Sequence, residues 1–358
     1  MDEMTALTRF RARLAYADPA VLARTRNRLL DLADGRRTPD HGRGRFQPAR
    51  RRLAVAAVVT ALATTGVIAA DSLVVDDRPV GATAEAADML QRAADATIAA
   101  ADPPVGPDEY LRVTTVAVYG SAYVDAESGG DAYRWLSTYT QDLFIPGDPG
   151  AEWVLRRSSR VPYRPEDVQA ARRAGVADTP GFTERAVGGA FFGTEPEGDW
   201  QSPTREFLAS LPTEPQELLE RIYRDSAGKG PSRDGEAMVY IADLLRSGIV
   251  PADLRAALFR AAALIPGVEL VEQRANLDGR TGVAVGRYEP ATGTRTEIIF
   301  DPETGELIGE REVLVDHSAG PTLPAGSAIA WTAVSVAVVP AAEVDAIPAQ
   351  PPPGRGGD

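Results

Sequence analysis

The sequence of 358 residues contains no cysteine and only two histidines. The lack of cysteine excludes a disulfide framework and any zinc site built on thiolates. His41 and His317 lie far apart, and neither has a second histidine nearby. This excludes the HExxH zinc protease motif and the iron site of two histidines and one carboxylate.

The chain also lacks a GxSxG nucleophile motif and the glycine spacing of a phosphate-binding loop. We therefore predict a protein that is not an enzyme, with no catalytic residue, no cofactor and no metal site. A hydrolase that uses only a pair of carboxylates is a further alternative, because acidic residues are abundant and sequence does not define their separation.

Charge is distributed unevenly along the chain. The net charge at pH 7 is −13, but residues 1–52 carry +7 and residues 53–358 carry −20. The long acidic part lacks the basic face that nucleic acid binding requires, so a nucleic acid partner is not expected.

An uncharged run of eighteen residues, 53–70, follows directly after Arg50, Arg51 and Arg52. As a helix this run would span about 27 Å, close to the hydrocarbon thickness of a bilayer. Positive charge stays on the cytoplasmic side of a membrane, so the three arginines predict a cytoplasmic N-terminus and an outer C-terminal part. A cleaved signal peptide fits less well because 52 residues precede the run, and a buried helix of a soluble protein would need partners on every side.

The topology predicts a single-pass protein of the cell membrane, with the lipid bilayer as one partner. Composition and pattern divide the chain into a basic cytoplasmic segment with one helix, a transmembrane helix, a linker with a juxtamembrane helix, an extracytoplasmic domain and a disordered tail. In the same order, the five parts are the cytoplasmic segment 1–52, the transmembrane helix 53–75, the linker and juxtamembrane helix 76–104, the extracytoplasmic domain 105–340 and the tail 341–358.

In the extracytoplasmic part, the sequence pattern predicts strands, then helices, then strands again. Alternating apolar and polar residues predict strands, and apolar residues at helical spacing predict helices. Residues 160–203, rich in proline and glycine, predict a long loop. This order of elements predicts an α+β domain, an antiparallel sheet with helices on one face. Expected strands are 110–119, 132–143, 153–159, 268–274, 281–288, 294–300, 307–315 and 327–339, and expected helices 203–211, 213–225, 235–247 and 251–264.

Aromatic residues concentrate in the first group of strands and form a candidate ligand or partner surface. The alternative is that these aromatics only pack within the sheet, where such residues are favoured. The candidate residues are Tyr110, Tyr133, Trp135, Tyr139 and Trp153.

Four segments resemble a family of uncharacterised actinobacterial single-pass membrane proteins that is known by a locus-derived name. They are LPTEP at 211–215, VPADLRAALFR at 250–260, IPGV at 265–268 and IIFDPETG at 298–305. The resemblance implies a short cytoplasmic segment, one membrane span and an outer domain. It also implies, through neighbouring genes, a link to extracytoplasmic-function sigma factors. The outline of sheet and helices is further similar to periplasmic lipoprotein-carrier and sigma-regulator sensor domains, which bind lipid-like ligands.

Two hypotheses for function follow. In the first, the outer domain binds a ligand or partner, and the cytoplasmic helix 19–33 holds a sigma factor or another regulator, as an anti-sigma protein would. In the second, the chain is an envelope binding or scaffold module without a signalling role, and residues 1–52 only orient the membrane span.

Overall fold

A computed structural model of the chain describes residues 81–124, 132–148, 150–173, 178–193, 198–316 and 324–350. All of them belong to one compact unit, Val74–Asp358. The arginine cluster at 50–52, the predicted cytoplasmic helix 19–33 and the predicted transmembrane helix 53–75 lie outside the described residues. Among the helices within these ranges, none has the length and apolar character needed to cross a membrane.

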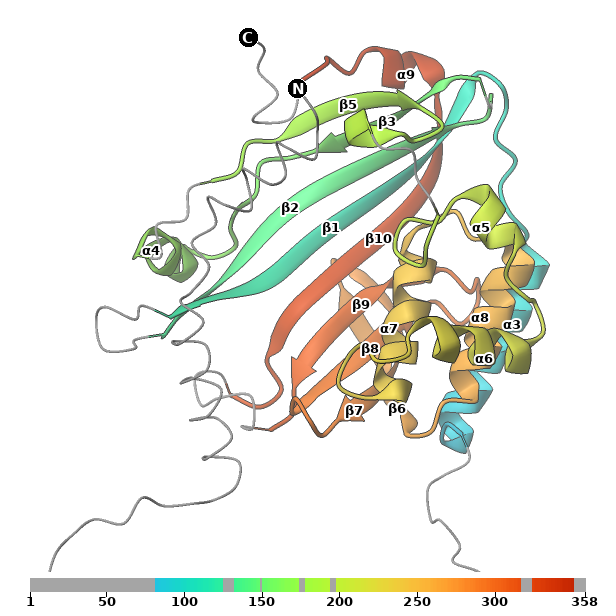
Figure 1. Cartoon of the computed structure of the whole chain (residues 1–358), viewed down its shortest axis with the longest axis vertical. Coiled ribbons are helices and arrows are strands. Elements are labelled where there is room, and N and C mark those ends of the chain that lie inside the picture. Colours follow the sequence, from blue (N-terminus) through green and yellow to red (C-terminus); the bar gives the residue numbers. More distant parts are fainter. Residues whose placement is uncertain are drawn as a thin grey trace, which may run out of the picture. The chain divides into compact units, whose positions relative to one another are not determined.

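The described residues form an α+β fold with one large antiparallel sheet (Figure 1). The helices are α3 Ala84–Ala100, α4 Pro165–Arg173, α5 Arg205–Ala209, α6 Pro215–Asp225, α7 Arg233–Arg246, α8 Ala252–Ala263 and α9 Ala341–Asp345, with a 3-10 turn η1 at Phe191–Gly193. The strands are β1 Glu109–Val124, β2 Ala132–Pro146, β3 Glu152–Arg157, β4 Val161–Pro162, β5 Phe182–Val187, β6 Val268–Leu277, β7 Arg280–Glu289, β8 Thr294–Phe300, β9 Leu307–Leu314 and β10 Ala328–Pro340.

The strand order across the sheet is β5-β3-β2-β1-β10-β9-β8-β7-β6, and β4 pairs with β2 outside this path. Most neighbours in the sheet are also neighbours in the sequence, as in a meander. Strand β3 pairs with β5 although β4 lies between them in the sequence. The long-range exception is the pairing of β1 with β10, which aligns Glu109 with Pro340 and Tyr119 with Ala330. This pairing joins the early strands to the late ones, and the helices α5 to α8 lie between them in the sequence.

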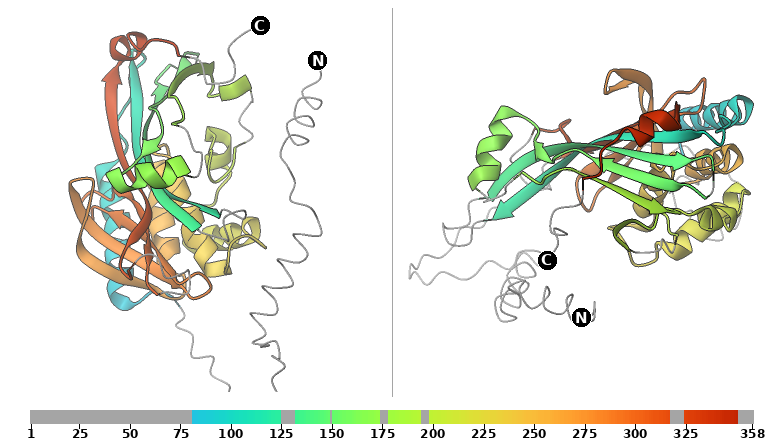
Figure 2. Two further views of the ribbon diagram at one scale, coloured as in Figure 1. Left: turned by 90° about the vertical axis from the view of Figure 1, so that its left-hand side faces the viewer. Right: turned by 90° about the horizontal axis from the view of Figure 1, so that it is seen from above.

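The sheet has two faces, and side chains alternate between them along each strand. We call one of them the helix face. It carries Leu111 and Val113 of β1 and Ile145 of β2. Leu111 is paired with Ile145, and Val113 contacts the end of α7. The back face carries Tyr110 and Phe144. Figure 2 shows β3, β5 and helices α5 to α7 on the same side of β1 and β10.

The largest apolar core lies between the helices and strands β6 to β8. Helix α8 contacts α3, α6 and α7, and α7 lies across β7, β8 and β9. The side chains of Leu258, Phe259 and Phe300 are almost completely buried there, and the rings of Phe259 and Phe300 are 5.2 Å apart. Burial of such side chains supplies most of the stability of a domain of this size.

The α+β class and the antiparallel sheet with helices are confirmed, and every predicted strand and helix within the described residues is present. The prediction of one long loop at 160–203 is wrong. Its described part contains β4, α4, β5 and η1. Helix α4 is short and polar, and it is held to the sheet by Asp167, whose carboxylate accepts hydrogen bonds from the Leu136 N–H (3.0 Å) and the Arg164 guanidinium (2.9 Å).

The predicted disordered tail, 341–358, begins with ordered structure. Helix α9 follows β10 directly, and its Val344 is buried on the back face with Tyr110 and Phe144. Gln350 then pairs with Thr183 at the edge of β5. Apolar contacts and backbone pairing thus fix residues 341–350, and α9 lies with the back-face cluster, opposite to the layer of α5 to α8.

Candidate functional site

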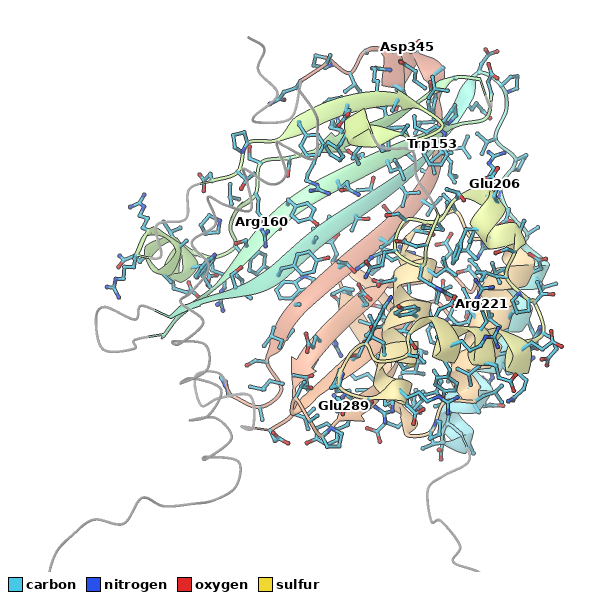
Figure 3. The ribbon with its side chains drawn as sticks, viewed as in Figure 1. Trp153, Arg160, Glu206, Arg221, Glu289 and Asp345 are labelled. Atoms are coloured by element: carbon cyan, nitrogen blue, oxygen red, sulfur yellow. The ribbon has the colours of Figure 1, made fainter. Side chains whose placement is uncertain are left out.

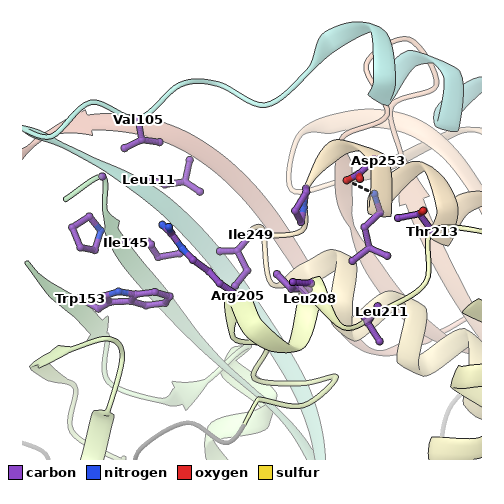
Figure 4. A pocket seen from close by; sticks show the side chains of 15 residues that line it. Val105, Leu111, Ile145, Trp153, Arg205, Leu208, Leu211, Thr213, Ile249 and Asp253 are labelled. Carbon is purple, nitrogen blue, oxygen red and sulfur yellow. Dashed lines mark hydrogen bonds between the residues drawn. The ribbon is translucent and has the colours of Figure 1, made fainter. Parts of the chain in front are cut away.

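A cavity of about 650 Å³ lies on the helix face, where the ends of β1, β2 and β3 meet α5 and the segment between α7 and α8 (Figure 4). We call it the α5 cavity. In Figure 3 the labelled Trp153 and Glu206 show where β3 and α5 lie. The lining residues are Val105, Leu111, Ile145, Pro146, Gly147, Trp153, Arg205, Leu208, Ala209, Leu211, Thr213, Ile249, Pro251, Asp253 and Leu254.

The strand wall of the cavity follows from the register of the sheet. Leu111 and Ile145 are direct partners across β1 and β2 and therefore share a face. Trp153 precedes Val154, which pairs with Phe144 on the back face, so Trp153 points to the helix face beside Ile145. The three side chains make this wall apolar.

The opposite wall is built by the short helix α5. Thr204 caps α5 by accepting a hydrogen bond from the Phe207 N–H (3.1 Å), which fixes where the helix begins. Leu208 of α5 and Leu211, two residues after the end of the helix, are then directed inward, and each is 6% exposed. Ala209 is exposed and also lines the cavity, so a larger side chain at this position would enter the free volume.

The segment between α7 and α8 forms a third wall of the cavity. Gly248 ends α7 with φ +70°, and Pro251 precedes α8. A Cβ atom at Gly248 would lie 2.8 Å from the Val113 side chain, so this glycine allows the close approach of α7 to β1. Ile249 follows and lines the cavity.

Two charged side chains are among the lining residues, Arg205 and Asp253. Asp253 lies in the first turn of α8, and its carboxylate accepts a hydrogen bond from the Leu254 N–H at 2.8 Å. Arg205 is exposed on α5, and within the described residues no carboxylate forms an ion pair with it. Figure 4 shows its side chain extending from α5 toward the strand wall, while Asp253 lies on the helix side near Thr213.

Only one of the five predicted aromatic surface residues, Trp153, lines the cavity. Tyr110 is buried on the back face with Phe144 and Val339, so it is not part of the same surface. Trp135 is only 7% exposed, and Tyr133 lies in β2 opposite Tyr123.

Tyr139 lies on the helix face away from the cavity, in a row of side chains across β1, β2 and β3. Its ring centre is 6.2 Å from that of Tyr119, and the Arg157 guanidinium lies 4.9 Å above the Tyr139 ring. Burial raises the pKa of Tyr119 to about 12. The structure therefore divides the aromatic set among the cavity, the face of the sheet and the back-face cluster.

A partly buried network of charges links α7 to the sheet on the same face. Arg246 of α7 forms ion pairs with Asp243 of the same helix and with Glu310 of β9. Thr332 donates a hydrogen bond to Glu310 at 3.1 Å, and Gln201 donates one to Asp243 at 3.0 Å. Burial raises the pKa of Glu310, although Arg246 acts in the opposite direction. Each member is partnered, so the network stabilises the contact between α7 and the sheet.

Sequence patterns did not identify the residues of the α5 cavity apart from Trp153. Leu208 and Leu211 had the spacing of an inward helix face, but this pattern is also that of ordinary core residues. Within the described ranges, no cluster of three or more metal-ligating side chains has the geometry to hold a metal ion.

No protein-family model matches the chain, and no curated protein matches it in sequence. Among solved structures, one described as the complex structure of Pseudomonas aeruginosa MucA/MucB is similar with 12% sequence identity and a TM-score of 0.24. The similarity covers 71% of this chain and 57% of that chain, so this chain spans less than two thirds of its length. A TM-score of 0.24 is too low to support a conclusion about function. The function proposed below is therefore argued from the α5 cavity.

Proposed function

We propose that this chain is a single-pass membrane protein whose extracytoplasmic domain binds an apolar small molecule in the α5 cavity. The observation that carries the proposal is the cavity itself. Its volume of about 650 Å³ lies within the usual range for small-molecule sites, roughly 300–1,000 Å³. Its walls include Leu111, Trp153 and Ile249, which are only partly buried, together with the buried side chains of Ile145 and Leu208.

The energetic argument follows from the nature of these walls. Each Å² of apolar surface removed from water stabilises a complex by about 25 cal/mol, before the entropy lost on association is subtracted. A protein-binding scaffold needs a broad outer surface, whereas this cavity is concave and bounded by the sheet, by α5 and by the segment that precedes α8. A small apolar molecule fits this shape better than a protein partner.

The test is photolabelling of the full chain in lipid nanodiscs with a neutral, diazirine-labelled long-chain alcohol. We expect labelled peptides to include residues 105–111, 145–153, 205–211 and 249–254. Ala209→Phe would fill the cavity and should lower this labelling about tenfold, because overpacking a filled site costs on the order of 1–3 kcal/mol.

Ala99→Phe is the matched control, because Ala99 is also an exposed helical alanine but does not line the cavity. It should leave the labelling unchanged. Equal labelling of wild type and Ala209→Phe, or labelling of wild type only in the membrane-spanning peptide, would refute the proposal.

We further propose that residues 53–75 anchor the domain in the membrane and that the cytoplasmic helix 19–33 contacts a regulator, in line with the resemblance to sigma-linked membrane proteins. The test is affinity capture from membranes with the full chain and with a chain that lacks residues 19–33. Recovery of a sigma factor by the full chain alone would support the regulatory role. Equal recovery by both chains, or none by either, would favour the scaffold alternative.

A further inference from the structure

We propose that Arg205 binds the anionic headgroup of a single-chain amphiphile whose apolar chain occupies the α5 cavity. This inference rests on the proposed function and adds the class of ligand. Its basis is the position of Arg205 at the edge of a mostly apolar cavity, where no carboxylate among the described residues forms an ion pair with it.

Several arginines of the neighbouring helices have a carboxylate partner within the domain, whereas Arg205 lines the cavity and has none among the described residues. Arg221, Arg246, Arg255 and Arg260 all form ion pairs with carboxylates of the domain. Residues 53–358 carry a net charge of −20, so acidic partners are plentiful. Even so, no ion pair joins Arg205 to any carboxylate among the described residues.

The surroundings of Arg205 suit an anion joined to an apolar chain. The side chain extends toward the strand wall, where Ile145 and Trp153 exclude water from part of the site (Figure 4). A guanidinium presents parallel N–H donors that match the two oxygens of a carboxylate or a phosphate. Partial removal of water strengthens such a charge-assisted hydrogen bond relative to the same contact in bulk solvent.

Asp253 must be considered because it also lines the cavity and would repel an anion. It lies on the helix side of the cavity, away from the strand wall, and one of its carboxylate oxygens accepts a hydrogen bond from the first turn of α8. The two charges therefore mark different ends, with the headgroup end at Arg205. A cationic amphiphile would instead need Asp253, and this provides a direct alternative for the test.

The experiment measures half-maximal photolabelling of the cavity peptides in the full chain, in nanodiscs of zwitterionic phosphatidylcholine. The probes are a diazirine-labelled C16 fatty acid, its neutral methyl ester, a lysophosphatidic acid with the same chain and a C16 trimethylammonium. We expect the two anionic probes to label at about tenfold lower concentration than the ester. The fatty acid and lysophosphatidic acid arms distinguish a free carboxylate from a lipid phosphate as the preferred headgroup.

The variants separate charge recognition from folding. Arg205→Ala should abolish the preference for anions while labelling by the ester persists, and Arg205→Lys should retain part of the preference. Arg224→Ala is the matched control, because Arg224 is exposed on α6, has no ion pair in the described part of the chain and does not line the cavity. It should behave as wild type.

The outcomes are distinguishable. An anion preference that survives Arg205→Ala, or cationic labelling that is lost in Asp253→Asn, would overturn the assignment of the headgroup while the proposed function stands. Absence of cavity labelling by every probe, the ester included, would overturn the proposed function as well.

Discussion

A substitution at Gly248 tests how much the close approach of α7 to the sheet contributes to the free energy of unfolding. Its φ is +70°, and a Cβ atom there would lie 2.8 Å from both methyl groups of Val113. Alanine at a left-handed position costs about 1–2 kcal/mol for the backbone alone. Overpacking against Val113 adds roughly 1–3 kcal/mol, because real Cβ atoms do not approach so closely. We therefore expect Gly248→Ala to lower the free energy of unfolding by about 3 kcal/mol.

Gly228 is the matched control for this prediction. Its φ is +77°, and a Cβ atom there would meet nothing within 4 Å. Gly228→Ala should therefore cost only the backbone term, about 1 kcal/mol. The difference between the two variants isolates the contact with Val113.

The assay is urea unfolding of the full chain in nanodiscs, followed by tryptophan fluorescence. The signal reports on this domain alone, because all four tryptophans lie in the described residues: Trp135, Trp153, Trp200 and Trp331. Val113→Ala in the Gly248→Ala background should recover part of the loss, with a coupling energy of about 1–2 kcal/mol. Equal destabilisation by the two glycine variants, or no coupling with Val113, would refute the reasoning.

Three further predictions use the same assay. Burial raises the pKa of Asp167, but the hydrogen bonds that its carboxylate accepts hold this pKa below the usual value. The contribution of Asp167 to the free energy of unfolding is therefore present above about pH 4 and is lost as pH falls through the lowered pKa. Asp167→Asn should lower the free energy of unfolding by about 2 kcal/mol at pH 7 and weaken its dependence on pH below about 4. The same pH dependence in wild type and variant would contradict this prediction. Since burial raises the pKa of Tyr119 to about 12, stability should fall as pH rises from 10 to 12, by about 2–3 kcal/mol more in wild type than in Tyr119→Phe; equal slopes would refute this. Ser232 accepts a hydrogen bond from the Gly235 N–H (3.0 Å) at the start of α7 and donates one to Glu289, so Ser232→Ala should cost about 1–2 kcal/mol, and a loss below 0.5 kcal/mol would show that the cap is dispensable.

The anion preference expected at Arg205 has a separate dependence on salt. Arg205 is exposed, so its attraction for a headgroup should weaken as the ionic strength rises toward 1 M, where charges are screened within about 3 Å. The preference for the fatty acid over its ester should therefore shrink in high salt, while labelling by the ester stays constant. A preference independent of salt would indicate recognition of shape rather than of charge.

The sequence by itself determined most of the individual elements, because their signals are local. Thr83 precedes α3 and caps it through the Ala86 N–H, and the turn at 301–305 closes the hairpin of β8 and β9 as its proline and glycine predict. Periodicity of apolar residues then distinguishes strands from helices, since it reflects which side of each element is buried.

Only the tertiary structure decided where these elements meet. Helix α4 escaped prediction because its nine residues are polar and its stability comes from the contact of Asp167 with β2, which is distant in sequence. The α5 cavity depends on several segments between 105 and 254, and their apolar residues have the same pattern as ordinary core positions. Whether such residues fill a core or line a cavity is set by the distance between the elements that carry them, here the separation of α5 from the ends of β1 to β3, and no local sequence pattern encodes that distance.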